Sequence, residues 1–316
     1  MAAAIQGGNL TRVIRQSLIA VPVALAAILW FQPATLLTAQ ETEALPVARY
    51  FPGPLADPVE PRMSIGLVVS NVLSGFGGER EVFALPDPDD SRSDWQAAAA
   101  IGGTIPLIRF ASNARGGFLL AAQAGVYARF RIEYPSRDEL STDWIVAGAL
   151  EFAQEDLSGR FRLSHRSSHL GDEFVEVSGA TRVEFGGEAF DLHVARTFPG
   201  IARLYAGATW IFRSYTRHLE PLVREGIGDC CVIQLGSDGV WHPFPNRHLE
   251  LVAGIDWQAA ERIRWRSYTS LAGGLTWREG TRSAGFIARL STGRSALGQF
   301  YNTPETAYGV EFAVTF

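Results

Sequence analysis

The stretch HRSSHLGDE, residues 165–173, holds two histidines, two serines and two adjacent acids within nine positions. This set of side chains could serve nucleophilic catalysis, metal binding or the polar base of a loop. Which of these is feasible depends on the backbone, because the residues that share one face differ between a helix and a strand.

Metal binding depends on the distance between the histidines. His-x-x-x-His suits zinc on a helix, where residues four apart are neighbours. On a strand, His165 and His169 lie about 13 Å apart at roughly 3.3 Å per residue, so we do not expect them to bind zinc as a pair. Asp172 and Glu173 could supply oxygen ligands to calcium, although two acids in an outer loop are more often solvated. The sequence leaves the metal unknown, with calcium as the candidate.

Alternation of apolar and polar residues dominates the chain from residue 63 onward, and it indicates half-exposed strands. The segment 117–133 is the clearest case: its even positions are apolar, whereas the odd face carries Gln123, Tyr127, Arg129, Arg131 and Glu133. We expect residues 174–183 to form a loop, because a strand there would give an odd number of strands. We predict about twelve strands, with ten or fourteen as alternatives, near 63–75, 94–109, 117–133, 143–153, 157–168, 184–197, 200–214, 231–242, 247–258, 262–278, 281–292 and 305–316.

A soluble sandwich also alternates, but three observations favour an antiparallel transmembrane β-barrel. The polar faces are rich in arginine, aromatic residues recur near the ends of the apolar stripes, and short connections on one side oppose long ones on the other. We therefore expect an all-β fold. The net charge of −5 gives no reason to expect nucleic acid as a partner. The arginines expected to line the lumen are Arg129, Arg131, Arg160, Arg162, Arg264 and Arg266.

The N-terminal region has the layout of a cleaved signal peptide. Arg12 and Arg15 precede an uncharged apolar run, and Ala39 offers a cleavage point. We expect residues 1–39 to be the signal peptide and residues 40–62, with five prolines, to be an irregular periplasmic lead-in. Residues 63–316 would form the barrel.

Two further features concern the cysteines and the C-terminus. Cys230 and Cys231 are adjacent, and we expect two unpaired loop residues because neighbours pair only through a strained ring. The last ten residues place apolar side chains on one face and end at Phe316. This ending resembles the sorting signal of bacterial outer-membrane proteins. The resemblance implies a location in the bacterial outer membrane and the barrel-assembly machinery as a partner.

In such a barrel the apolar stripe faces lipid, and His165 and Ser167 continue the stripe of Phe161 and Leu163. Residues two apart on a strand leave the same face, about 6.6 Å apart. Ser167 could therefore be a nucleophile with His165 as its base. An orienting acid would complete the site. Glu184 is the favoured candidate, because even-numbered residues of the next strand face outward, and Glu173 and Asp172 are the alternatives.

His-x-Ser at the outer edge of a barrel strand resembles outer-membrane phospholipase A and the lipid A 3-O-deacylase of the same compartment. The resemblance implies acyl-ester hydrolysis, with outer-membrane lipid as the partner. The chain departs from both families at Ser168, where they carry asparagine.

A broader resemblance rests on the motifs LADPVEPR at 55–62, SHRSSHLGDE at 164–173 and GRSALGQFY at 293–301. They are similar to the domain-of-unknown-function 1207 family of Gram-negative envelopes, although Val59 and Phe174 replace an expected Arg and Tyr. This resemblance supports the barrel and its location, and it implies no activity.

A non-enzymatic role is the alternative to the proposed hydrolase activity. Ser168, His169 and Gly171, with Asp172, could form a turn that holds the loop base over the lumen. Lumenal arginines could then fill the interior as ion pairs, or leave a small arginine-lined pore for anions. The pairs considered join Arg160, Arg162 or Arg166 with Glu151, Asp191 or Glu133.

Overall fold

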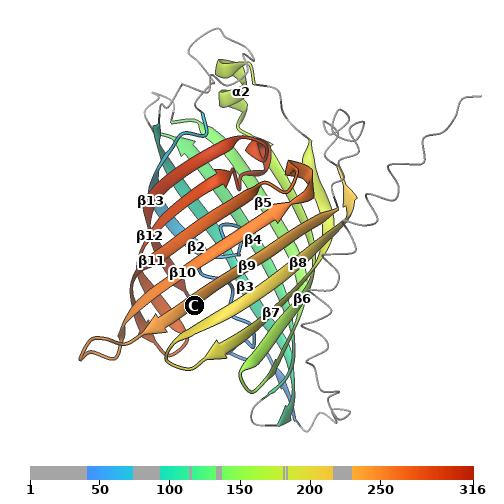
Figure 1. Cartoon of the computed structure of the whole chain (residues 1–316), viewed down its shortest axis with the longest axis vertical. Helices are drawn as coiled ribbons and strands as arrows, with labels where there is room; N and C mark the ends of the chain where they lie inside the picture. Colours follow the sequence, from blue (N-terminus) through green and yellow to red (C-terminus); the bar gives the residue numbers. More distant parts are fainter. Residues whose placement is uncertain are drawn as a thin grey trace, which may run out of the picture.

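A computed structural model of the chain describes residues 41–73, 93–113, 116–132, 137–180, 182, 184–215 and 230–316. Within them, strands β2 to β13 pair antiparallel in sequence order, and β2 pairs with β13 to close a twelve-stranded barrel (Figure 1). The expected signal peptide lies outside the described residues. The strands are β2 (Met63–Ser70), β3 (Asp94–Asn113), β4 (Gly116–Arg131), β5 (Glu139–Gln154), β6 (Leu157–Leu170), β7 (Phe185–Phe198), β8 (Ala202–Ser214), β9 (Cys231–Trp241), β10 (Leu249–Ala260), β11 (Ser267–Glu279), β12 (Arg282–Arg294) and β13 (Pro304–Thr315).

The predicted barrel and its number of strands are confirmed, although several strand boundaries differ, most of all the end of β2 and the start of β11. A 3₁₀ turn at Glu261–Ile263 precedes β11, and Arg264 and Trp265 take positive φ angles of 57° and 58°. The strand therefore begins at Ser267, five residues later than predicted. Arg264 and Arg266 lie exposed in this connection, so placing them in the lumen was wrong.

Every strand from β2 to β13 carries at least one large apolar side chain that is exposed. A soluble protein would bury such stripes, whereas a membrane barrel presents them to lipid. No helix of the described residues has both the length and the apolar character needed to cross a membrane. Side chains with large exposed areas include Ile65, Leu67, Ile101, Ile105, Trp144, Val146, Phe161, Leu163, Trp210, Leu235, Leu271, Phe286 and Val310.

The segment that precedes the barrel enters it from the periplasmic end. After β1 (Glu41–Ala44), which pairs with the lower part of β3, residues 45–62 run inside the barrel as a plug (Figure 1). Phe51 and Ala56 are fully buried there, and Glu60 is only 5 % exposed. Apart from β1, the described lead-in is irregular and without helix as predicted, but residues 45–62 lie inside the barrel, so their predicted periplasmic position is wrong.

Charged side chains of the barrel wall bind the plug. Arg160, fully buried, donates to both oxygens of Glu60 at 2.5 and 2.9 Å. Arg49 donates to Glu151 Oε1 at 2.5 Å, and the backbone N–H of Phe51 donates to Glu151 Oε2 at 2.9 Å. Buried charges are tolerated when they are paired and hydrogen bonded in this way, so the wall positions the plug closely.

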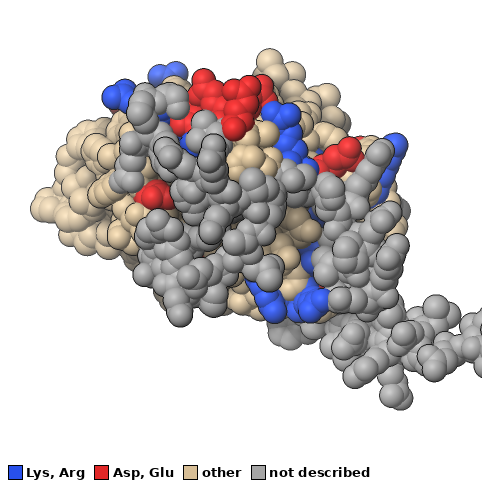
Figure 2. Space-filling view, turned by 90° about the horizontal axis from the view of Figure 1, so that it is seen from above, with Lys and Arg blue, Asp and Glu red and all other residues tan. Residues whose placement is uncertain are grey.

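An apolar lid covers the extracellular end. The sequence expected only loop after β6, but Asp172–Ser178 forms the short helix α2. A Cβ atom at Gly171 would collide with the carbonyl oxygen of Glu139, so glycine allows the chain to turn closely here. Figure 2 views this end from above and shows acidic and basic side chains on the same face. The buried lid residues are Val72, Leu73, Leu140, Leu170, Phe174, Ala180, Leu297 and Phe300.

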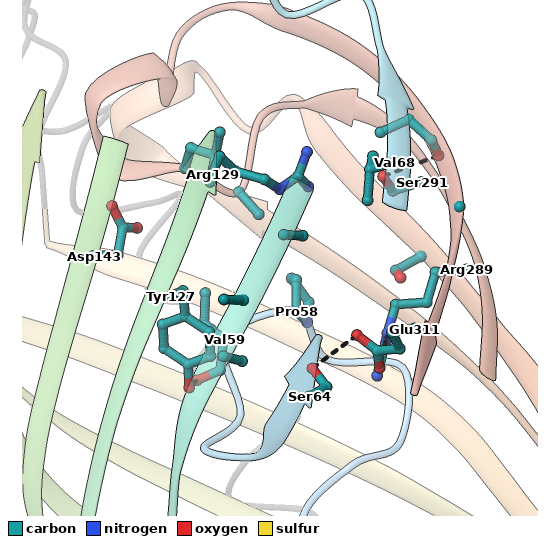
Figure 3. Close-up of a pocket in the computed structure, with 18 of the residues that line it drawn as sticks. Pro58, Val59, Ser64, Val68, Tyr127, Arg129, Asp143, Arg289, Ser291 and Glu311 are labelled. Atoms are coloured by element: carbon teal, nitrogen blue, oxygen red, sulfur yellow. Dashed lines mark hydrogen bonds and ion pairs between the residues drawn. The ribbon is translucent and has the colours of Figure 1, made fainter. Parts of the chain in front are cut away.

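Between plug and lid the described lumen retains little space. A cavity of about 90 Å³ lies above the plug, lined by Tyr127, Arg129, Arg289 and Glu311 among others (Figure 3). A larger one of about 730 Å³ lies below, among periplasmic turns and the plug. Because the lumen between plug and lid has so little free space, a site formed by the HRSSHLGDE residues has more room on the outer surface than in the lumen.

Candidate functional site

The outer face of β6 changes from apolar to polar near its extracellular end. Phe161 and Leu163 are 43 % and 46 % exposed, and the next outward residue is His165, whose side chain is 50 % exposed. Ser167 follows on the same face, because its neighbour Ser168 is buried in the lumen. The histidine and the hydroxyl therefore stand where the lipid-facing band ends.

Glu188 on β7 lies directly opposite His165 in the strand register. Its Oε1 atom is 3.3 Å from His165 Nδ1. A carboxylate on Nδ1 leaves Nε2 available to a nucleophile, which is the arrangement of a catalytic triad. Both side chains are on the outer face, with Glu188 24 % exposed.

Ser167 lies between Gly186 on β7 and Trp144 on β5. A Cβ atom built at Gly186 would lie 3.7 Å from Ser167 Cβ, so the missing side chain leaves the surface beside the hydroxyl open. Across the described part of the chain, the Ser167 side chain makes no hydrogen bond, either to His165 or to another group. Such bonds often form only when substrate is present.

Tyr215, just past β8, is a fourth member of the site. Its hydroxyl donates to Glu188 Oε1 at 2.8 Å, and its backbone N–H donates to the carbonyl of Gly186 at 2.8 Å. Its ring meets the His165 ring edge-on, with centroids 6.3 Å apart. The bond to Glu188 raises the pKa of Tyr215 above its ordinary value, so the phenol keeps the proton that it donates.

The orienting acids expected from the sequence are not the one that reaches His165. Glu184 is exposed immediately before β7, and Glu173 is exposed on α2. Glu188 and Tyr215 were missed. Glu188 could have been noticed as the acid on the outer stripe of β7, whose even residues were expected to face lipid, whereas no sequence signal identified Tyr215.

The polar loop cluster does not converge on one site. Ser168 is buried and donates to Asp143 Oδ1, and its carbonyl accepts from Gln299 Nε2 at 2.6 Å. His169 faces outward, whereas Asp172 pairs with Arg182 at the rim. The cluster thus divides between lid support, outer face and solvent.

The four remaining lumenal arginines lie inside the barrel, each beside an acid. Arg162 donates to Asp191 at 2.7 Å, Arg131 pairs with Asp138, and Arg129 lies 3.9 Å from Glu305. Arg160 binds Glu60 of the plug rather than Glu151 of its neighbouring strand. The expected partner Glu133 lies outside the described residues.

Cys230 and Cys231 form a disulfide, so the expectation of two unpaired cysteines was wrong. With Glu261 they make up the one group of three potential metal ligands with closely spaced donor atoms that we find in the described ranges. Paired sulfurs are not thiolate ligands. The acids Asp172 and Glu173 belong to no such group, and calcium stays a prediction.

Several solved structures of outer-membrane barrels are similar to this chain. An active-site mutant of outer membrane phospholipase A from Escherichia coli matches with a TM-score of 0.50 and 12 % identity, over 82 % of this chain and 93 % of that one. The Salmonella typhi phospholipase dimer with bound calcium gives 0.49 and 11 %, over 82 % and 93 %. LpxR from Salmonella typhimurium gives 0.37 and 10 %, over 80 % and 99 %.

The closed barrel, its apolar outer surface and its fold make this a bacterial outer-membrane protein. Among curated proteins, no relative matches the sequence. The family model described as "Protein of unknown function (DUF1207)" matches residues 88–316, and the chain belongs to that family.

Proposed function

We propose that the protein hydrolyses acyl esters of outer-leaflet lipid, with Ser167 as nucleophile, His165 as base and Glu188 as orienting acid. The observation that carries the proposal is the 3.3 Å contact between His165 Nδ1 and Glu188 Oε1 on the outer face, two residues from a hydroxyl. A histidine–glutamate pair that only stabilised the fold could lie in the lumen and would not need a position on the outer face. The shared fold with a protein named outer membrane phospholipase A supports a lipid substrate.

The reaction follows the general course of serine hydrolysis. Ser167 Oγ attacks the ester carbonyl carbon while His165 Nε2 takes the hydroxyl proton. The carbonyl oxygen carries the displaced electron pair until the bond to the alcohol oxygen breaks, and His165 returns the proton to that leaving oxygen. Water, deprotonated by His165, then attacks the acyl group on Ser167, which releases the fatty acid and restores the hydroxyl. Glu188 stabilises the charged imidazole during both transfers.

The test compares full-length wild type with Ser167→Ala in detergent micelles with outer-membrane lipids. Release of fatty acid is measured by mass spectrometry, with calcium and with EDTA, because calcium remains a candidate ligand. We expect Ser167→Ala to lower the rate at least about 10³-fold. Ser237→Ala is the matched control, because Ser237 pairs with the outward residues Leu204 and Ile255. Equal release by wild type and Ser167→Ala would exclude the proposed nucleophile.

A non-enzymatic structural barrel is the second candidate, and the plugged, lidded lumen favours it over an anion pore. Planar-bilayer recordings distinguish these two. Steady single-channel conductance of the full chain would support the pore, whereas a silent barrel without hydrolysis would support the structural role.

A further inference from the structure

A β-bulge reverses which side chains of β8 face outward. Glu188 pairs with Arg213 and Ala189 pairs with Ile211, so Phe212 is an extra residue between them. Below the bulge, odd-numbered residues such as Arg203 and Tyr205 are buried in the lumen. Above it, Arg213 and Tyr215 are exposed on the outer surface. Bulges next to functional sites commonly redirect side chains in this way.

The guanidinium of Arg213 is held in place but not fully occupied. Its central carbon lies 4.9 Å from the centroid of the Tyr215 ring, and its Nε is 3.9 Å from Glu188 Oε2. That separation exceeds the 2.7–2.9 Å typical of a charge-assisted hydrogen bond. The Arg213 side chain is 66 % exposed, and its guanidinium makes no hydrogen bond within the described chain. Donors therefore remain for an external acceptor.

The position of Arg213 corresponds to the edge of the hydrocarbon layer. Trp210 and Phe212 precede it on β8, and their rings cluster with Phe190 on β7, 4.7 Å from Phe212. Aromatic girdles of this kind lie at the membrane interface. Ester and phosphate groups of lipids occupy the same level.

Ser167 and Arg213 are two strands apart, and the register places Arg213 level with His165, so the Ser167 and Arg213 backbones lie roughly 12 Å apart at the usual strand spacing and rise. A lipid with an acyl ester close to its phosphate could reach both side chains. We propose that Arg213, supported by the Tyr215 ring, binds the phosphate of the substrate, so that the site of the proposed function, on which this inference rests, accepts phosphate-bearing acyl lipids. Arginine suits this role because its planar donors match phosphate oxygens.

The test measures binding rather than turnover, in the Ser167→Ala background. Purified full-length protein is titrated with phosphatidylglycerol, lipid A or phosphate-free diacylglycerol, and bound lipid is counted by native mass spectrometry. We expect Arg213→Gln to weaken binding of at least one phosphate lipid about tenfold or more and to leave diacylglycerol unchanged. Arg266→Gln is the control, because Arg266 is another exposed arginine in an extracellular connection.

The phosphate lipid that loses more affinity identifies the natural source. Equal binding by Arg213→Gln and its parent would overturn the assignment, and so would an equal loss for diacylglycerol. Since all variants carry Ser167→Ala, failure of this test leaves the hydrolase proposal standing. Absence of hydrolysis by the wild type likewise leaves the phosphate site standing.

Discussion

A carboxylate can orient a histidine only from behind the nitrogen that faces away from the nucleophile. Glu188 meets that condition at His165 Nδ1, and Glu184 does not. We expect Glu188→Ala to lower kcat for lipid hydrolysis by about 10²-fold or more, because the imidazole loses both orientation and charge compensation. Fatty-acid release under saturating substrate provides the measurement.

Glu184→Ala is the matched control for that experiment, since it removes an exposed acid four residues before Glu188, which the strand register places opposite His165. Its rate should equal that of the wild type. If Glu184→Ala were the slow variant and Glu188→Ala the fast one, Glu184 rather than Glu188 would be the orienting acid.

Tyr215 acts through Glu188 and is therefore a positioning residue. Phenylalanine keeps the ring that supports Arg213 but removes the 2.8 Å bond to the carboxylate. Because this bond helps to hold the carboxylate against His165, Tyr215→Phe should lower kcat about tenfold. KM should stay within about twofold, and a rise in KM at constant kcat would instead assign Tyr215 to substrate binding.

The sequence predicted part of this site and could not predict the rest. Period-two alternation alone placed His165 and Ser167 on one outward face. Which acid lies opposite His165 is set by the strand register. The connection from β6 to β7 is too long for turn geometry to fix that register, so the sequence could not identify Glu188. The outward direction of Arg213 and Tyr215 results from the extra residue at Phe212, because without the bulge these odd-numbered positions would face the lumen.

At the scale of elements, the plug is the part that sequence patterns described least well. Its prolines correctly indicated irregular backbone. Its position inside the barrel depends on ion pairs such as Arg160–Glu60, whose members are 100 residues apart. No local pattern reports a partner at that distance, so a charged segment beside the barrel and one within it have the same sequence signature.

Breaking the Arg160–Glu60 pair should destabilise the barrel. Removing one member leaves the other charge buried without its bidentate partner, and we expect Arg160→Met or Glu60→Gln to lower the free energy of unfolding by about 3–5 kcal/mol. Because the double variant leaves no lone charge, it should be more stable than Arg160→Met alone. Urea unfolding followed by tryptophan fluorescence measures this; additive losses would show that the two groups do not interact.

The same pair predicts a specific acid sensitivity. Burial would raise the pKa of Glu60, but Arg160 and Arg162 outweigh it and lower the pKa from 4.5 to about 2. A carboxyl group whose pKa is lowered on folding stabilises the folded state at pH values above its ordinary pKa. This contribution is lost as pH falls from about 4.5 to about 2. The stability difference between wild type and Glu60→Gln should therefore shrink across that window, and a constant difference would contradict it.

Across the whole molecule, the ion pairs in the lumen explain why arginine is used as the basic residue. All 28 basic residues are arginine. Arginine stays charged when buried and offers several donors in one plane, which suits bidentate pairs such as Arg160 with Glu60 and Arg203 with Asp238. The interior thus binds a plug with charged groups while the exterior remains apolar. This division leaves the outer rim as the surface where lipid chemistry could occur.

Assembly into the membrane should depend on Phe316. Phe316 follows β13, is 77 % exposed and makes none of the ring contacts found in the described chain, so its loss should hardly affect the finished barrel. We expect Phe316→Ala to lower the outer-membrane yield several-fold, because the aromatic end of the final strand region resembles a sorting signal, with urea stability unchanged. Ile201→Ala, which also removes an exposed apolar side chain at the periplasmic end, should assemble normally. Membrane fractionation with quantitative blotting checks this, and equal yields for both variants would show that the assembly machinery does not require the terminal ring.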